Sequence, residues 1–173
     1  MSSSAAVPPS LKASFPPIVR PDTRLLALGS LPGEVSLARS QYYAHPHNRF
    51  WPLMAEVLDD ADAAARDYAL RLAALGRHGV GLWDVVKSAT RAGSLDANIR
   101  DHAPNALAEL VVALPQLRAV AFNGAKAAAL GRRLISPRAR WTLIDLPSSS
   151  PANTRPFAEK RAAWLALRPF IRR

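Results

Sequence analysis

Four short apolar runs, with longer segments between them, constrain the fold of this chain more than any other feature. They cover residues 24–28, 79–83, 118–122 and 141–146, and each predicts a strand. Strands that alternate with helical segments form a parallel sheet covered by helices. We therefore expect an α/β fold, a three-layer α/β/α sandwich around a central, mainly parallel four-stranded sheet.

Helical patterns occupy several of the segments outside these runs. Apolar residues at 107, 110, 111 and 114 have the spacing of an amphipathic helix, which opens near Pro104. The alanine-rich stretch 125–134 is helical by propensity. A C-terminal helix is predicted over 157–170, and its lysine and arginines, at 160, 161 and 168, are expected to form a basic surface. Helices are thus expected on both faces of the sheet.

Length and composition predict a single domain. The chain has 173 residues, 49% of them hydrophobic, which is enough for one full core. Serine and proline are frequent before the first strand, so we expect residues 1–20 to form a flexible N-terminal arm and residues 21–173 the domain. The chain has no cysteine, which excludes disulfides, a thiolate nucleophile, and cysteine-held zinc or iron–sulfur clusters.

The charge of the chain points to a polyanionic partner. There are 23 Lys and Arg against 13 Asp and Glu, a net charge of +10, which favours nucleic acid through phosphate neutralisation. A solvated, arginine-rich surface is the alternative. No apolar run approaches the ~20 residues that cross a bilayer, and the N-terminus lacks the regions of a signal peptide. We expect a cytoplasmic, nucleoid-associated protein without a membrane partner.

Polar or glycine-rich segments follow three of the predicted strands, and they form the candidate site. They are residues 29–33, the pair Asn123 and Gly124, and residues 146–155. Open parallel sheets bind ligands at the carboxyl ends of their strands, where these segments should meet. Residues 29–33 match neither the Gly-x-Gly-x-x-Gly nor the Gly-Lys-Ser/Thr pattern, so a nucleotide-phosphate loop is disfavoured.

Six short motifs together carry a family resemblance. They are GSLPG at 29–33, YYAHPHNRFW at 42–51, LWDVV at 82–86, GSLDANI at 93–99, FNG at 122–124 and LPSSSPAN at 146–153. Each motif is weak alone, but their order and spacing are specific. With them the chain resembles the uracil-DNA glycosylase superfamily, and above all its hypoxanthine-DNA glycosylase branch.

This resemblance implies a monofunctional DNA glycosylase. Such an enzyme hydrolyses the N-glycosidic bond of a flipped deaminated base, here hypoxanthine or also uracil, and leaves an abasic site. It implies DNA with deaminated bases as partner, no metal and no cofactor, and we expect a monomer. Lyase activity is not expected, because the catalytic clusters hold no candidate lysine. Two alternatives stay open: a mismatch-specific uracil or thymine glycosylase, and a non-catalytic protein that binds damaged or single-stranded DNA.

The glycine-containing motif departs from the mismatch-specific branch at one position. That branch usually has a polar catalytic residue in the middle of the loop, where this chain has Leu31. An apolar side chain cannot orient a water molecule, so the resemblance to the hypoxanthine branch assigns this catalytic role to Asn48. The alternative for Asn48 is a helix cap before Phe50.

The resemblance also implies which residues hold the base. Tyr43 matches the aromatic residue that stacks on the flipped base. The amide of Asn123 offers an acceptor beside a donor, which pairs with the deaminated edge of hypoxanthine or uracil but not with adenine or cytosine. Gly29, Ser30 and Leu31 are expected to supply backbone and shape around the base.

Phosphate contacts are expected from residues that surround the base site. These predicted DNA-binding residues are Ser148, Ser149, Ser150, Asn153, Arg155, Lys126 and His47. Phe50 and Trp51 are interpreted as core. Asp84 and Asp96 are interpreted as structural carboxylates, with Asp84 bonded to backbone amides.

Overall fold

The computed structural model describes residues 8–136 and 140–172. Its central sheet has four strands in the order β3-β2-β6-β7, and all neighbours are parallel. The strands are β2 (Leu25–Gly29), β3 (Val80–Asp84), β6 (Ala119–Asn123) and β7 (Thr142–Leu146). Each predicted apolar run forms a strand within about one residue of its expected place, which confirms the predicted fold class.

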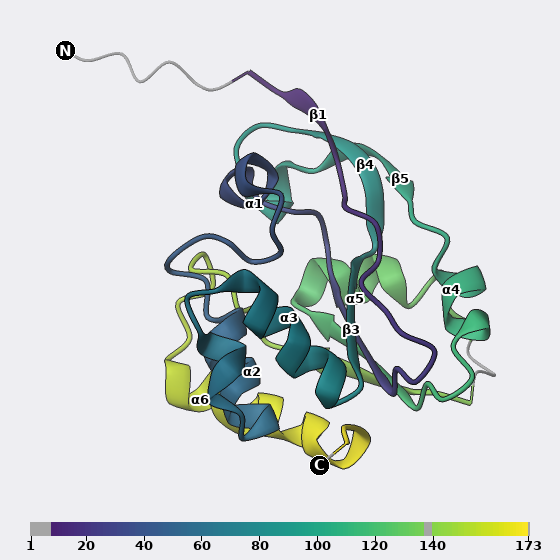
Figure 1. The fold of residues 1–173 in the computed structure, drawn as a ribbon. Coiled ribbons are helices and arrows are strands. Elements are labelled where there is room, and N and C mark those ends of the chain that lie inside the picture. The colour runs from purple at the N-terminus through teal and green to yellow at the C-terminus, as the bar shows by residue number, and fades with distance from the viewer. Residues whose placement is uncertain (1–7, 137–139, 173) are drawn as a thin grey trace.

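Helices cover both faces of this sheet, because successive strand residues point to opposite sides. In β2, Leu25 and Ala27 belong to one core cluster, and Leu26 and Leu28 belong to the other. The first cluster packs against α2, α3 and α6, and the second against α4 and α5, as Figure 1 shows. The helices are α1 (Glu34–Arg39), α2 (Phe50–Leu58), α3 (Tyr68–Arg77), α4 (Leu107–Ala113), α5 (Ala125–Gly131) and α6 (Phe157–Trp164). Three 3₁₀ helices cover Ala61–Ala64, Asp96–Asn98 and Leu165–Phe170, the last continuing directly from α6.

The predicted basic surface of the C-terminal helix is wrong for Lys160, which is buried, whereas Arg161 is exposed; all three cations contact other parts of the protein. Lys160 is 2% exposed and donates to backbone carbonyls, as described below. Arg161 forms an ion pair with Glu56, at 2.7 Å, and Arg168 donates to the backbone oxygens of residues 56 and 57. These contacts join α6 and the segment after it to α2.

A second, antiparallel sheet was not predicted. Its strands run in the order β1-β4-β5, with β1 (Ser10–Ala13), β4 (Val86–Arg91) and β5 (Arg100–Pro104). The expected flexible arm is therefore wrong for part of residues 1–20, because β1 pairs along its whole length with β4, and Ile18 forms a bridge with Leu82. The first seven residues of the arm lie outside the described residues. In Figure 1 this sheet lies next to the carboxyl end of β3, from which the chain continues into β4.

Within the described ranges, no helix is long and apolar enough to cross a membrane.

Candidate active site

A cavity of about 1000 Å³ lies at the carboxyl ends of the parallel strands. It brings together most of the predicted site residues, as expected for an open α/β sheet. Those that line it are Gly29, Ser30, Leu31, Tyr43, Asn48, Asn123, Lys126, Ser148, Ser149, Ser150 and Asn153. Arg155 and His47 are exposed and do not line it. His45 lines the cavity, and its Nδ1 accepts from the backbone N–H of His47 at 3.1 Å.

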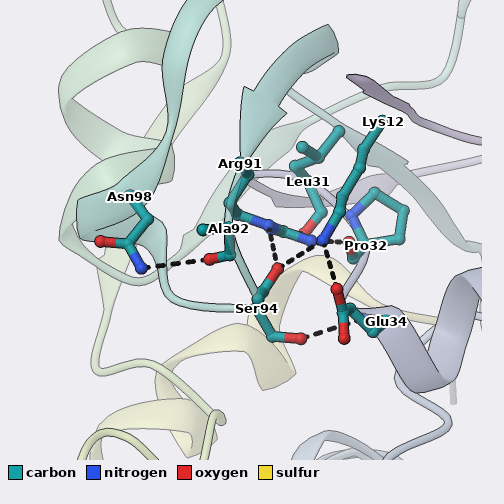
Figure 2. A network of polar contacts seen from close by, with 9 residues as sticks. Lys12, Leu31, Pro32, Glu34, Arg91, Ala92, Ser94 and Asn98 are labelled. Atoms are coloured by element: carbon teal, nitrogen blue, oxygen red, sulfur yellow. Dashed lines mark hydrogen bonds and ion pairs between the residues drawn. The ribbon is translucent and has the colours of Figure 1, made fainter. Parts of the chain in front are cut away.

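One side of the cavity is the glycine loop, residues 29–33, which the second sheet holds from behind. The buried guanidinium of Arg91 donates to the carbonyl oxygens of Leu31, Pro32 and Gly93 (Figure 2). These bonds satisfy a charge that would otherwise be costly to bury. The side chain of Leu31 packs in a small apolar cluster with Val86. The loop therefore offers backbone and an apolar wall, in line with the absence of a polar side chain at position 31.

Lys12 completes this support from β1. Its ammonium group forms an ion pair with Glu34 at 2.7 Å and donates to the carbonyl oxygen of Gly93 at 2.6 Å. The hydroxyl of Ser94 accepts from the backbone N–H of Glu34 at 3.0 Å (Figure 2). The unpredicted strand β1 is thus part of what fixes the glycine loop.

The opposite side is the serine loop, residues 147–153, which Asn123 anchors. The Asn123 amide donates from Nδ2 to Ser149 Oγ at 2.8 Å and accepts at Oδ1 from the Ser149 N–H at 2.9 Å. Asn123 is 7% exposed and Ser149 is fully buried. Gly124 has φ of 100°, a conformation that favours glycine, and a Cβ there would lie 3.1 Å from Ser148 Cβ. The serine loop thus packs directly on the end of β6.

Helix α6 holds the other end of the serine loop. Lys160 Nζ donates to the carbonyl oxygens of Asn153 and Ser150, at 2.8 and 3.3 Å, and Trp164 Nε1 donates to that of Pro147 at 3.0 Å. Burial lowers the pKa of Lys160, with Arg49 and Arg155 adding to the effect. The loop also closes its own turn, since Ser148 Oγ accepts from the N–H of Ser150 at 3.1 Å.

Tyr43 occupies the cavity with one ring face covered. Its ring stacks on that of Phe50, with centroids 3.8 Å apart and an angle of 11° between the planes. Its φ of 53° is in the left-handed region, a strained conformation for a bulky residue. Phe50 and Trp51 are buried, which confirms their interpretation as core residues. Tyr43 Oη is buried and has no hydrogen-bond partner among the described residues.

Asn48 lies between the cavity and the start of α2. Its Oδ1 accepts from the N–H of Phe50 at 2.9 Å, at the start of α2, and the residue lines the cavity. An amide oxygen has two lone pairs, so this bond leaves one lone pair and the NH₂ group for a ligand.

Asp84 is the functional candidate that sequence reasoning missed. It ends β3, lines the cavity, and is 3% exposed. Its Oδ2 has no partner among the described residues, so the expected bonding to backbone amides is not found for this oxygen. Burial, and then the charge of Asp96, raise the pKa of Asp84 to about 7. The sequence does contain a signal for this role, because Asp84 directly follows a predicted strand and so lies at the same edge of the sheet as the other candidate segments.

Asp96 differs from Asp84 although it lines the same cavity. It is only partly buried, and its Oδ1 accepts from the hydroxyl of Ser30 at 2.5 Å. No group of three or more histidines, aspartates or glutamates in the described ranges could hold a metal ion.

These features define an α/β protein with a cavity at the carboxyl ends of its parallel strands, walled by backbone, an aromatic ring and a few polar side chains. The chain belongs to the uracil DNA glycosylase superfamily, whose family model matches residues 16–168. The family resemblance drawn from the six motifs is thereby confirmed.

Two curated relatives are similar over nearly their whole length. A protein of Methanosarcina barkeri named hypoxanthine DNA glycosylase is 39% identical over 153 residues, which are 88% of this chain and 95% of the relative. A protein of Methanosarcina acetivorans with the same name is 36% identical over 91% of this chain and 98% of the relative. A solution structure from Methanosarcina acetivorans, described as that of a candidate uracil DNA glycosylase, superposes with a TM-score of 0.82 at 34% identity and covers 93% of this chain and 99% of its own.

Proposed function

We propose that this protein is a monofunctional DNA glycosylase. It hydrolyses the N-glycosidic bond of a flipped deaminated base, hypoxanthine and also uracil, and leaves an abasic site. The observation that carries the proposal is the cavity, in which Tyr43, Asn48 and Asn123 meet within a fold whose relatives are named hypoxanthine DNA glycosylase. The reaction needs water but no cofactor, and the cavity is complete within one chain, which favours a monomer.

The flipped base stacks on Tyr43 in this proposal. Phe50 covers one face of the Tyr43 ring, and Tyr43 lines the cavity; in this proposal the other face of the ring receives the base. Stacking on an aromatic side chain is the usual way in which an extruded base is stabilised.

The two amides have separate roles. Asn48 positions the water that attacks the anomeric carbon, using the oxygen lone pair and NH₂ group that its bond to Phe50 leaves. Asn123 reads the deaminated edge with its second N–H and second lone pair, because Ser149 already takes one of each. A base with the inverse donor and acceptor order would leave these buried groups unpaired.

DNA phosphates are bound around the rim of the cavity. The serine loop provides hydroxyls and backbone amides, while the side chains of Lys126, Arg155 and His47 can carry positive charge or donate hydrogen bonds to phosphate oxygens. The net charge of +10 supports this binding over a longer range.

The test is release of base from defined DNA. Duplexes with one deoxyinosine, one deoxyuridine or one G·T mismatch are incubated with the protein, the free base is identified by mass spectrometry, and alkali then cleaves the abasic strand. Release of hypoxanthine is the expected result. Release of only uracil or thymine would favour a mismatch-specific glycosylase, and salt-dependent binding without any release would leave a non-catalytic DNA-binding protein.

A further inference from the structure

Asp84 has a buried carboxyl group that no role above uses. We propose that Asp84 is the proton donor to the departing purine, so that hypoxanthine leaves as a neutral base. This inference rests on the proposed glycosylase function and adds a catalytic residue to it.

The position of Asp84 shows why the carboxyl group faces the base site. Asp84 pairs with Gly29 on the neighbouring strand β2. A Cβ on Gly29 would lie 2.6 Å from Asp84 Oδ1 and 3.0 Å from Tyr43 Oη. The missing side chain therefore leaves the space in which the carboxyl group and the tyrosine hydroxyl approach the backbone of the glycine loop.

The hydrogen bonding of this region is incomplete without a ligand. Asp84 Oδ2 and Tyr43 Oη are both buried, both residues line the cavity, and neither atom has a partner among the described residues. Buried polar atoms in folded proteins are nearly always hydrogen-bonded, so unpaired ones need an explanation. A ligand with polar ring atoms, stacked on Tyr43, would supply the missing partner for the carboxyl group.

The surrounding charges favour a protonated Asp84 near neutral pH. Burial and the Asp96 carboxylate raise its pKa to about 7, while Arg91 lowers it. Arg91 is itself bonded to three backbone carbonyl oxygens, and Asp96 is held by the hydroxyl of Ser30. The phenol groups of Tyr42 and Tyr43 also face this carboxyl group, and burial raises the pKa of both tyrosines, so they stay neutral.

The Asp84 carboxylic acid gives its proton to a ring nitrogen of hypoxanthine, N7 or N3, while the C1′–N9 bond breaks and its electron pair goes to the base. The base leaves neutral, and the sugar is left as an oxocarbenium ion. Water held by Asn48 adds to C1′ and loses a proton, which returns to the Asp84 carboxylate. The products are free hypoxanthine and an abasic sugar, and Asp84 is regenerated.

The test compares the wild-type protein with Asp84→Asn under single-turnover conditions between pH 5 and 9. Asparagine keeps the shape but cannot transfer a proton, so hypoxanthine release should fall by about 100-fold or more. The wild-type rate should decrease as the pH rises through about 7, the region in which Asp84 loses its proton, and this decrease should be absent in the variant. Asp145→Asn is the matched control, since Asp145 lies in β7 near the same edge but is exposed and paired with Arg132.

A second measurement does not depend on the folding of the variant. The wild-type protein is given duplexes with 7-deaza- or 3-deaza-2′-deoxyinosine, each of which lacks one of the two candidate ring nitrogens. At least one of these bases should be released about 10-fold or more slowly and without the fall near pH 7. If both analogues were released with the rate and pH profile of deoxyinosine, or if Asp84→Asn kept the rate and pH profile of the wild-type protein, the role of Asp84 would be overturned. The proposed glycosylase function would not be affected by that result. No release of any base by the wild-type protein would overturn the proposed function as well.

Discussion

The two sides of the cavity differ in how their buried polar atoms are satisfied. On the serine-loop side, Asn123 and Ser149 bind each other through two hydrogen bonds, and Lys160 binds two carbonyl oxygens of the loop. On the glycine-loop side, Asp84 Oδ2 and Tyr43 Oη lie buried without a partner in the described part of the chain. The serine-loop side therefore has its buried polar atoms paired within the protein, whereas next to the glycine loop the buried Asp84 Oδ2 is unpaired within the described residues.

This difference separates two buried polar residues that end the two strands on either side of β2. Asn123 ends β6 and Asp84 ends β3, and both line the cavity. Removing Asn123 should cost stability as well as base selection, because Ser149 already takes one N–H and one lone pair of its amide. Changing Asp84 should mainly cost activity, because its partner is the substrate. Variants on each side of the cavity test this distinction.

The largest effect is expected for Asn48→Ala, between the two sides. Loss of the amide that positions water should reduce hypoxanthine release by about 1000-fold, while DNA binding is retained. The helix-capping bond to Phe50 is lost too, at about 1 kcal/mol of stability. Asn48→Ser, whose hydroxyl can still accept from Phe50, should regain stability but not activity. Near-full activity of Asn48→Ala would reduce Asn48 to a helix cap.

Gly29→Ala should reduce release by roughly 100-fold, since a displaced Asp84 can no longer transfer its proton. The added methyl group would collide with Asp84 Oδ1, at 2.6 Å, within a buried environment. Gly33→Ala is a useful comparison, because its Cβ would meet only Ser94 at ordinary contact distance, 3.4 Å. Single-turnover rates of the two variants measure the difference. Equal rates would mean that the space beside Gly29 has no role.

Tyr43→Ala should weaken the flipped state by about 10-fold, as expected for loss of one base–aromatic stack. The fluorescence of 2-aminopurine placed beside deoxyinosine reports how much of the base is extruded. Tyr43→Phe keeps the ring that stacks on Phe50 and should keep the flipped state. A fluorescence signal unchanged in Tyr43→Ala would exclude stacking on this ring.

Asn123→Ala tests the serine-loop side. It leaves the N–H and hydroxyl of the fully buried Ser149 without partners, which should cost about 1–3 kcal/mol of unfolding free energy. Chemical denaturation measures this loss. The variant should also discriminate less between deoxyinosine and deoxyadenosine. Unchanged stability would contradict the anchoring of the loop by Asn123, and unchanged base selection would contradict its reading of the base.

The last effect concerns stability alone and is a pH-dependent gain for Asp84→Asn. The folded-state pKa of Asp84, about 7, lies above its ordinary value of 3.8, so the wild-type protein loses stability as the pH rises from about 4 to 7. Asparagine has no such loss. The difference of about 3 between these two pKa values corresponds to about 4 kcal/mol, so the variant should melt on the order of 10 °C higher than the wild-type protein at pH 8 and show no such advantage at pH 4. A constant difference at both pH values would contradict the burial of an ionisable Asp84.

Much of the fold could be predicted, because it depends on local patterns. The four apolar runs define the parallel strands, and the carboxyl-end rule places residues 29–33, Asn123 and the serine loop at one cavity. The antiparallel sheet could not be predicted in this way. All residues of β5 are exposed, and β1 is joined to β4 by backbone pairing across about 75 residues of chain, which no periodicity records.

The remaining errors share a physical cause. Lys160 has the sequence context of a solvated helix residue, yet it is buried because the serine loop just before α6 folds back and two of its carbonyl oxygens accept from the ammonium group. The environment of Asp84 is set by Gly29 and Tyr43, which lie beside its carboxyl group, and by Asp96, which helps to raise its pKa. These residues come from separate segments of the chain and meet only in the folded protein. Such properties depend on the partners that a side chain finds or lacks in space.

The most direct test of this account is a crystal structure with a duplex that contains a 2′-fluoro analogue of deoxyinosine, whose glycosidic bond resists hydrolysis. We predict that the hypoxanthine lies in the cavity, stacked on Tyr43, with a ring nitrogen within hydrogen-bonding distance of Asp84 Oδ2 and with Asn123 still bonded to Ser149. A base that remains in the duplex, or a flipped base with no contact to Asp84, would contradict the account.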